Sequence, residues 1–330
     1  MLAIVEPIRA ALLTYERAAA VALVQRYGAA YAAIEADLAA LTAQIEAAGP
    51  AVTPSWVIEQ EFYQRLLRNA RQAFAPIGLA VEQSIAEQQR ALRDLAQADA
   101  RRLLRAGGLG EPFTLKPDEV TALAAADATQ RATIALAQTL PEALVTNLKT
   151  SLNTIVLAAK ATARHATRSL VTLRNGLGNV LNGLLGFHRT SVLASYRAAT
   201  VAVYQANAPQ VQAWQWCANL NGDPRPCVVC VAMHGSIEPM STPLVAHRNC
   251  RCLALPVLTL APQPVLDRGA NWFAQQSPAI QRDILGAGKF RRYQAGELVL
   301  EDLIGTGMHP IYGAYRFERS LQELGAGARL

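Results

Sequence analysis

The sequence predicts an α+β protein that is mainly helical, with long extended N-terminal helices, a small Cys/His-stapled α+β module and a short C-terminal helical segment. Hydrophobic residues form 52% of the 330-residue chain and aromatic residues only 6%, a composition rich in alanine and leucine that favours helices with narrow apolar faces. All five cysteines and two of the five histidines lie within residues 217–252, where glycine, proline and asparagine replace the helical pattern. These changes divide the chain into four consecutive regions: 1–112 (long helices), 113–208 (basic helices), 209–262 (the Cys/His module) and 263–330 (a C-terminal helical segment and tail).

The N-terminal region is expected to hold two long helices. In residues 7–48, leucine, valine and isoleucine recur at three- and four-residue steps, which is typical of an amphipathic helix. After a proline- and glycine-containing break, Thr53 is the expected N-cap of a second helical stretch that runs to Arg105. Pro76 lies inside this stretch and should kink or split it, because proline lacks an amide donor and clashes with the preceding turn. We expect these helices to pack on one another and on partner subunits.

The basic region lacks acidic residues. No aspartate or glutamate occurs between Ala143 and Gly222, although this segment carries seven positive charges. A helix expected from residue 140 to about 174 would place several of them on one face, because they are four residues or about three turns apart. Such a stripe favours a nonspecific contact with a polyanion such as double-stranded DNA, or with an acidic partner. The candidate contact residues are Lys149, Lys160, Arg164, Arg168 and Arg174. A solvated helix face is the simpler alternative.

Residues 175–190, "NGLGNVLNGLLGFHRT", combine leucines at helical spacing with four glycines. We expect a flexible helix–turn–helix connection here, and a membrane-active peptide is the alternative. No charge-free apolar run is long enough to span a bilayer, and the N-terminus lacks the ordered regions of a secretory signal. The expectation is therefore a soluble chain made in the cytoplasm, where thiols stay reduced.

The periodicity changes after Pro209. Residues 211–216, "VQAWQW", are short, alternating and aromatic, which indicates a strand. From there to about residue 260 we expect a small domain of hairpins and loops. A final helical segment is expected over 271–304, followed by a glycine-containing tail.

The cysteine cluster has the spacing of a metal site. Cys227 and Cys230 form a Cys-x-x-Cys pair, and His247 and Cys250 follow in "HRNC", just before Cys252. Two close pairs separated by a loop are typical of structural zinc sites, and five cysteines cannot all pair as disulfides within one chain. We predict that Cys227, Cys230, His247 and Cys250 bind Zn²⁺, with Cys252 competing for the fourth position. Disulfides or free thiols remain the alternative.

The remaining cysteine and histidines are expected to have no role in this site. Cys217 is the expected bystander. His234 has no matching partner in the sequence and is expected on the surface. His165 and His188 stand in a basic helical context and are expected to be solvated.

The sequence does not predict an enzyme. "PCVVC" matches half of the zinc-deaminase signature, but that chemistry needs a glutamate beside an upstream histidine, and no carboxylate occurs between residues 143 and 222. Phosphate loops, dinucleotide fingerprints and nucleophile elbows are also missing from the sequence. A zinc ion with four thiolate and imidazole ligands has no open position for water. We therefore expect a structural site, with no catalytic residues and no small-molecule substrate.

The order "WQWCANLNGDPRPCVVCVAMHG … HRNCRCLALPVL" strongly resembles the phage Mu F-like minor head protein family. The residues that fall on its pattern are Trp214 or Trp216, Asp223, Arg225, Cys227, Cys230, Gly235, His247, Cys250, Arg251 and Cys252. The resemblance continues at Trp272, at Gln281, Leu285 and Gly286, and at Tyr293 and Gly296. It covers about residues 185–304. One departure is that family members carry Arg-Thr-Glu in the preceding helix, where this chain offers "HRTS" and "YRAAT".

This resemblance implies a structural minor capsid protein of a tailed phage or prophage-like particle. Such a protein would be made in the host cytoplasm and reside in the virion near the portal vertex, acting in head assembly and DNA passage. Its expected partners are the portal protein, the major capsid protein and packaged double-stranded DNA, with no membrane. Two alternatives from other classes remain: a zinc-dependent nonspecific nucleic-acid-binding protein, and a nucleic-acid-modifying enzyme.

Overall fold

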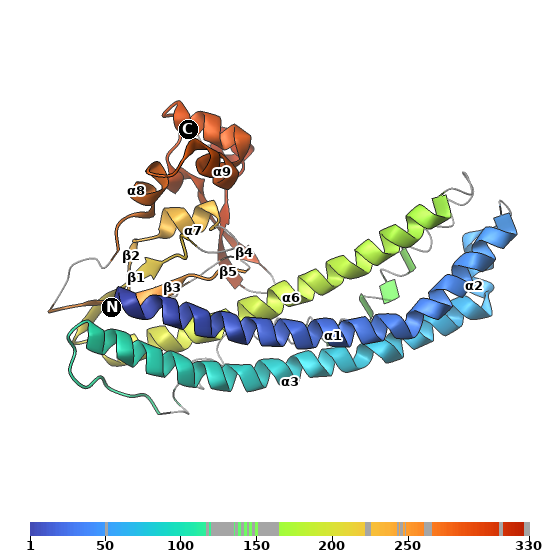
Figure 1. Ribbon diagram of the computed structural model, residues 1–330, viewed down its shortest axis with the longest axis horizontal. Helices are drawn as coiled ribbons and strands as arrows, with labels where there is room; N and C mark the ends of the chain where they lie inside the picture. Colours follow the sequence, from blue (N-terminus) through green and yellow to red (C-terminus); the bar gives the residue numbers. More distant parts are fainter. Residues whose placement is uncertain are drawn as a thin grey trace. The chain divides into compact units, whose positions relative to one another are not determined.

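In the computed structural model the chain forms two compact units; its helices and strands are labelled in Figure 1. It describes residues 1–49, 52–116, 119, 135, 138–139, 142–143, 145–146, 149–150, 165–221, 226–242, 244, 247, 249–260, 266–309 and 313–326. The sheet unit comprises Met1–Leu13, Gln88–Gln130 and Thr190–Leu330, and the helical unit comprises Thr14–Glu87 and Arg131–Arg189. Both units are discontinuous because long helices contribute residues to each, whereas the four regions predicted from composition are consecutive.

The first two long helices are α1, Leu2–Ala48, and α3, Glu61–Ala106, with the short α2, Pro54–Glu59, between them. Thr53 is the N-cap of α2, and its side chain accepts a hydrogen bond from the Trp56 amide, as the sequence predicts. Of the predicted kink or split at Pro76, the split does not occur, because α3 is uninterrupted there. The break falls at Gln60, whose extended backbone separates α2 from α3.

The third long helix, α6, spans His165–Ala206. The predicted helix–turn–helix connection over residues 175–190 is therefore wrong, because α6 runs through it. Each glycine costs a helix only about 1 kcal/mol relative to alanine, whereas a fully buried leucine contributes about 1.5–3 kcal/mol. Leu184 is buried, and Leu181 and Leu185 pack beside it, which offsets that cost. Within the described residues, no helix has the length and hydropathy needed to cross a membrane.

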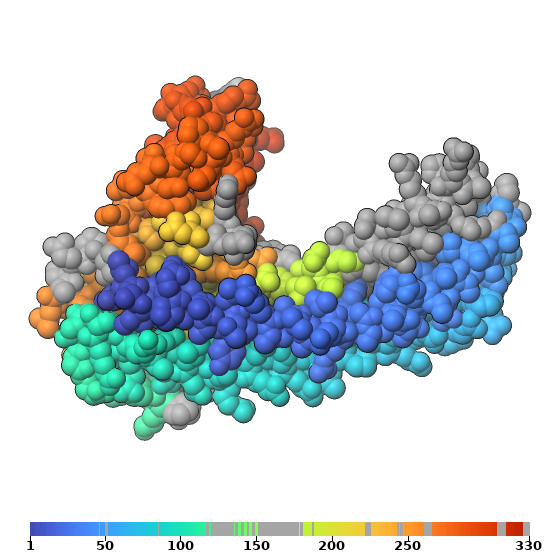
Figure 2. All heavy atoms as spheres, viewed as in Figure 1, coloured from blue at the N-terminus to red at the C-terminus, as the bar shows by residue number. Residues whose placement is uncertain are grey.

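The core of the helical unit forms between α1, α3 and α6. Ile34 and Leu66 are fully buried there, together with Leu184, and the rings of Tyr27 and Phe74 lie 5.2 Å apart. In the space-filling view, side chains of α1 (blue) and α3 (cyan) lie against each other (Figure 2). The narrow apolar faces predicted from composition are thus satisfied by helix-on-helix packing within this unit.

The sheet unit is built around three antiparallel strands in the order β2–β1–β3. These are β1, Val211–Cys217; β2, Ile237–Pro239; and β3, Leu253–Leu258. The register pairs Trp214 with Pro256 and Trp216 with Ala254. The predicted strand at 211–216 is confirmed. The described residues of the following segment hold two further strands, but they also hold a short helix, Val228–Met233, where only hairpins and loops were expected.

Both faces of the central strand pair are covered. Leu253, Leu255 and Cys217 pack in one cluster with side chains of α1, α3 and α6. Trp214 and Trp216 pack in another, which includes the short helix α7, Val228–Met233. Every residue of β3 is buried, as expected for a strand that is covered on both sides.

The C-terminal part contains helices and a hairpin. Its helices are α8, Gly269–Ala274; α9, Pro278–Gln294; the 3₁₀ turn η2, Leu300–Leu303; and α10, Leu321–Ala326. The strands β4, Ile304–His309, and β5, Gly313–Glu318, pair in antiparallel register. This hairpin lies where the sequence predicts the end of a helix and a tail. Gly305 faces Phe317 and Gly307 faces Tyr315, so aromatic rings cover the glycines of β4.

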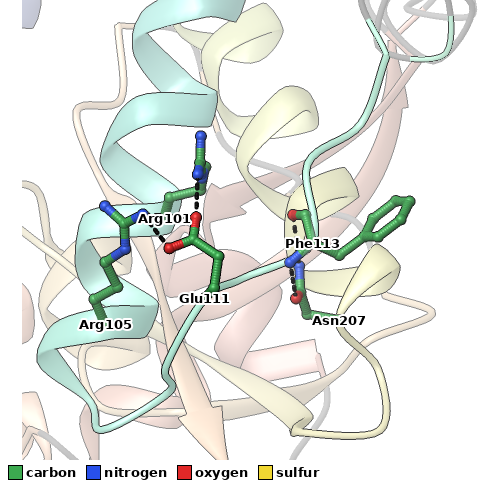
Figure 3. A network of polar contacts seen from close by, with 5 residues as sticks. All are labelled: Arg101, Arg105, Glu111, Phe113 and Asn207. Carbon is green, nitrogen blue, oxygen red and sulfur yellow. Dashed lines mark hydrogen bonds and ion pairs between the residues drawn. The ribbon is translucent and has the colours of Figure 1, made fainter.

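A short strap follows α3 and is tied down by two polar groups (Figure 3). Glu111 accepts hydrogen bonds from Arg101 at 2.5 Å and from Arg105 at 2.7 and 2.6 Å. Asn207, just beyond α6, accepts from the Phe113 amide at 2.8 Å and donates to the Phe113 carbonyl at 3.3 Å. The strap is thereby fixed to the end of α3 and to the end of α6, both in the sheet unit.

Candidate metal centre

The first half of the cysteine cluster is placed by the start of α7. Cys227 is the N-cap of this helix, and its Sγ accepts a hydrogen bond from the Cys230 amide at 3.4 Å. The Cys-x-x-Cys spacing therefore brings both sulfurs to the same turn. All six residues of α7 are buried, so the turn is held rigidly by the core around it.

The second half is a turn that leads into β3. The Cys250 amide donates to the His247 carbonyl at 3.2 Å, and Asn249 adopts a left-handed conformation with φ of 62°, which asparagine tolerates better than most residues. The Cys252 amide donates to Cys250 Sγ at 3.4 Å. The helix α6 fixes the turn from outside, because the Asn249 amide donates to Thr190 Oγ1 at 3.0 Å.

The two halves meet at Cys230. Its Sγ lies 3.1 Å from His247 Nε2, 3.8 Å from Cys250 Sγ and 3.3 Å from Cys252 Sγ. His247 Nε2 is also 3.0 Å from Cys227 Sγ. The five side chains form two groups that share Cys230: one with Cys227 and His247, the other with Cys250 and Cys252. Within each group the three ligand atoms lie within 4.8 Å of one another. The structure thus gathers the four predicted ligands and Cys252 around Cys230, and this cluster could hold a metal ion.

The donor set fits a tetrahedral thiolate-binding ion. With metal–sulfur bonds of about 2.3 Å, two ligand sulfurs should be separated by about 3.8 Å, which is the Cys230–Cys250 distance. The other contacts are shorter, so those donors would move apart by about half an ångström around an ion of this kind. The amide hydrogen bonds to Cys227 and Cys250 also suit deprotonated sulfur.

Electrostatics in the cluster separate the sulfurs into two kinds. The Cys230 thiol and then the His247 ring lower the pKa of Cys227, against the effect of burial. Burial would raise the pKa of Cys250, but hydrogen bonds from Cys230 and Cys252 and the Arg197 charge lower it well below its ordinary value. Hydrogen bonds to Cys227, Cys250 and Cys252 raise the pKa of Cys230. Two cysteines of the site are thus favoured as thiolates by their neighbours.

The imidazole of His247 responds to those thiolates. Burial alone would lower its pKa, but hydrogen bonds to Cys227 and Cys250 raise the pKa to about 11. The imidazole and these thiols therefore stabilise one another's charged forms. A divalent cation bound at this point would take the place of the proton as the positive charge.

Cys217 stays outside the cluster, as expected. It is buried, and its Sγ lies 3.2 Å from an Nη of Arg9, which also donates to the Ala218 carbonyl at 2.8 Å. His234 was expected on the surface and is instead buried, with Nδ1 accepting a hydrogen bond from the Ala218 amide at 3.0 Å. The expectation was wrong because the contact depends on β1 and α7 meeting in the folded unit.

The positive charges of the acid-free segment have several different environments. Lys149 is exposed. Lys160 and Arg164 lie outside the described residues, as do Asp223 and Arg225. Arg168 and Arg174 belong to α6, but their side chains are outside the described part of the structure.

Two further charges of this segment are compensated or buried. Arg189 forms an ion pair with Glu16 at 3.2 Å, and the Glu16 side chain is only 3% exposed. Arg197 is 4% exposed and donates to backbone carbonyls of the cysteine turn. Sequence reasoning missed both because the partners are distant in the chain.

His188 was expected to be solvated and is buried in the helical unit. Burial, and then the neighbouring Arg189 charge, lower its pKa from 6.5 to about 4. Below pH 6.5 the unfolded chain binds a proton that the folded chain does not, so the free energy of unfolding should fall as the pH falls to about 4. The full loss is about 3 kcal/mol.

Chemical denaturation of the wild type and of His188→Leu between pH 7 and pH 4 would measure this effect. The helical-unit transition of the variant should lose about 3 kcal/mol less than that of the wild type. Equal losses in both proteins would contradict the role assigned to His188.

The fold and the cluster define an α+β, mainly helical protein with a Cys/His site that could bind a metal ion. Comparison of the chain with protein-family models, with curated proteins and with solved structures found no match in any of the three.

Proposed function

We propose that this chain is a structural minor head protein of a tailed phage or prophage-like particle, associated with the portal vertex and packaged DNA. The observation that carries this proposal is the convergence of the cysteines and His247 on Cys230. The resemblance to the Mu F-like family rests on a Cys-x-x-Cys pattern and a His-x-x-Cys-Arg-Cys pattern. These two patterns can form one metal site only if their side chains lie close together in the folded chain.

Within this proposal the bound metal is Zn²⁺ and its role is structural. Zinc prefers thiolate and imidazole ligands in a closed tetrahedron, and the ligands we assign are Cys227, Cys230, His247 and Cys250. Cys250 is favoured over Cys252 because its Sγ accepts the Cys252 amide and because its pKa is lowered whereas that of Cys252 is raised, chiefly by burial. The ion would hold α7 and the turn before β3 together.

The long helices would serve assembly. Among the described residues, Val21, Val24 and Leu79 are large hydrophobic side chains that the helical unit leaves 55%, 45% and 59% exposed. Exposed apolar side chains on long helices are consistent with packing against partner subunits such as the portal protein or the major capsid protein.

The proposal is tested by locating the chain. Cells that carry its gene would be induced to produce particles, and DNA-filled particles would be purified and analysed by mass spectrometry after nuclease treatment. We expect the chain to remain with the particles, and cryo-electron microscopy should place it near the portal. A chain found only in the soluble fraction would overturn the proposal.

The basic stripe supports a nucleic-acid contact, the alternative function of a zinc-dependent nonspecific nucleic-acid-binding protein. Replacing Lys160, Arg164 and Arg168 by glutamate should weaken binding to double-stranded DNA. It should also reduce the slope of log affinity against log salt concentration by about 3, because each phosphate contact contributes about 0.9 to that slope. A matched control is the triple replacement of the exposed Arg17, Arg26 and Arg90. Equal effects of both triple variants would mean that the stripe is an ordinary solvated face.

A further inference from the structure

Arg197 is a buried charge that contacts the cysteine turn directly. It lies on α6 and is 4% exposed. Its Nε donates to the Cys252 carbonyl at 2.8 Å, and its Nη2 donates to the Cys250 carbonyl at 2.5 Å. One guanidinium therefore holds the backbone on both sides of Arg251.

The buried positive charge of Arg197 needs a compensating negative charge nearby. Among the residues that the structure describes, no carboxylate forms an ion pair with it. Backbone carbonyls are dipoles and supply no net negative charge, whereas a buried cation is costly unless an anion balances it. The sulfur atoms of Cys250 and Cys252, whose carbonyls it binds, can supply that charge, and they are close enough for the Arg197 charge to lower the pKa of both thiols.

The possible ligand sets differ in their net charge. A centre of one divalent ion and four thiolates has a net charge of −2. Three thiolates and one neutral imidazole give a net charge of −1, and two thiolates and two imidazoles give zero. Only the second is neutralised by a single guanidinium. Such balancing lowers the cost of burying the centre.

We propose that Arg197 is the counter-ion of the metal centre and specifies a set of three thiolates, Cys227, Cys230 and Cys250, with the imidazole of His247. This inference rests on the proposed metal site. It assigns Arg197 a positioning and charge-balancing role through the carbonyls of the turn, and it favours His247 over Cys252 as the fourth ligand. Groups that contact the metal ligands without binding the metal commonly change metal affinity by about 10–100-fold.

Thr190 is a matched control for the charge of Arg197. It lies two turns earlier on α6 and holds the same turn through the Asn249 amide at 3.0 Å, but it is uncharged. A loss of positioning should therefore follow from changes at either residue, whereas a loss of charge balance should follow only from changes at Arg197.

The experiment is a double-mutant cycle on the full-length chain, with Co²⁺ affinity measured by its visible absorption and confirmed by zinc competition. Arg197→Met should weaken binding about 10–100-fold in the native ligand set. Cys227→His converts the centre to a neutral one, and in that background Arg197→Met should cost at least about threefold less than in the native ligand set, because only its positioning role remains to be lost. Cys227 is partly exposed, so this position tolerates the exchange best. Thr190→Val should cost the same in both backgrounds.

The measured losses distinguish a counter-ion role of Arg197 from a role in positioning alone. Equal losses from Arg197→Met in both backgrounds would overturn the counter-ion role and leave only positioning. If Arg197→Met does not fold, Arg197→Lys and Arg197→Gln replace it, and the counter-ion role requires that the lysine variant binds more tightly. If the wild type binds neither Co²⁺ nor Zn²⁺, the metal centre itself fails, and the proposed function loses its main support.

Discussion

Replacing Cys230 with alanine should abolish metal binding and unfold the region around α7. Cys230 is the side chain that contacts His247, Cys250 and Cys252 at once. Structural zinc sites contribute about 10–16 kcal/mol of binding free energy that is coupled to folding. The loss of the shared ligand should therefore exceed the effect of any substitution in the apolar core.

The measurement is zinc content per chain after purification under reducing conditions, followed by thermal unfolding with and without a chelator. The wild type should hold about one zinc ion and lose stability on chelation, whereas Cys230→Ala should hold none and be insensitive to the chelator. Cys217→Ala is the matched control, because Cys217 is equally buried in the same unit but lies outside the cluster. Less than about half a zinc per wild-type chain would contradict a structural zinc site.

Gly235→Ala should destabilise the sheet unit by about 2–5 kcal/mol. Gly235 has φ of +78°, and a Cβ there would lie 2.2 Å from the Asp267 carbonyl oxygen. The left-handed backbone costs about 1–2 kcal/mol for an L-residue, and the clash adds about 1–3 kcal/mol because backbone must move. The Gly235 amide also donates to the Trp216 carbonyl at 2.8 Å, so such a shift would disturb the contact with β1.

Gly296→Ala separates the two contributions. Gly296 has a similar φ of +71°, but a Cβ there meets nothing within 4 Å, so only the backbone strain of about 1–2 kcal/mol applies. Urea denaturation of both variants should show the larger loss at Gly235. Equal losses would mean that the close approach to Asp267 relaxes without cost.

The candidate site was predictable because its signals are local. A Cys-x-x-Cys spacing places two sulfurs on one turn wherever a helix begins at the first cysteine, as at Cys227. The way the second cysteine turn is held in place was not predictable from local signals, because it depends on Arg197 and Thr190, which contact the turn across more than fifty residues of sequence.

The fold was predictable in its class and less so in its continuity. Glycines in residues 175–190 indicated a break, but burial of Leu184 against distant helices keeps α6 intact. In the β4–β5 hairpin, glycines occupy every second position of the central part of β4, so this strand has few apolar side chains to reveal it, and its stabilising partners, Tyr315 and Phe317, come from the opposite strand. Both errors arise where tertiary packing overrides local propensity.

The margins of the three-stranded sheet bear on how copies of this chain behave at high local concentration. One edge strand, β2, is only three residues long and ends in Pro239. The other edge strand, β3, carries Pro256 opposite Trp214. Short margins and prolines discourage strand addition by a neighbouring molecule. Crowded copies are therefore expected to associate through helix surfaces, and the sheet should not template fibrous aggregates.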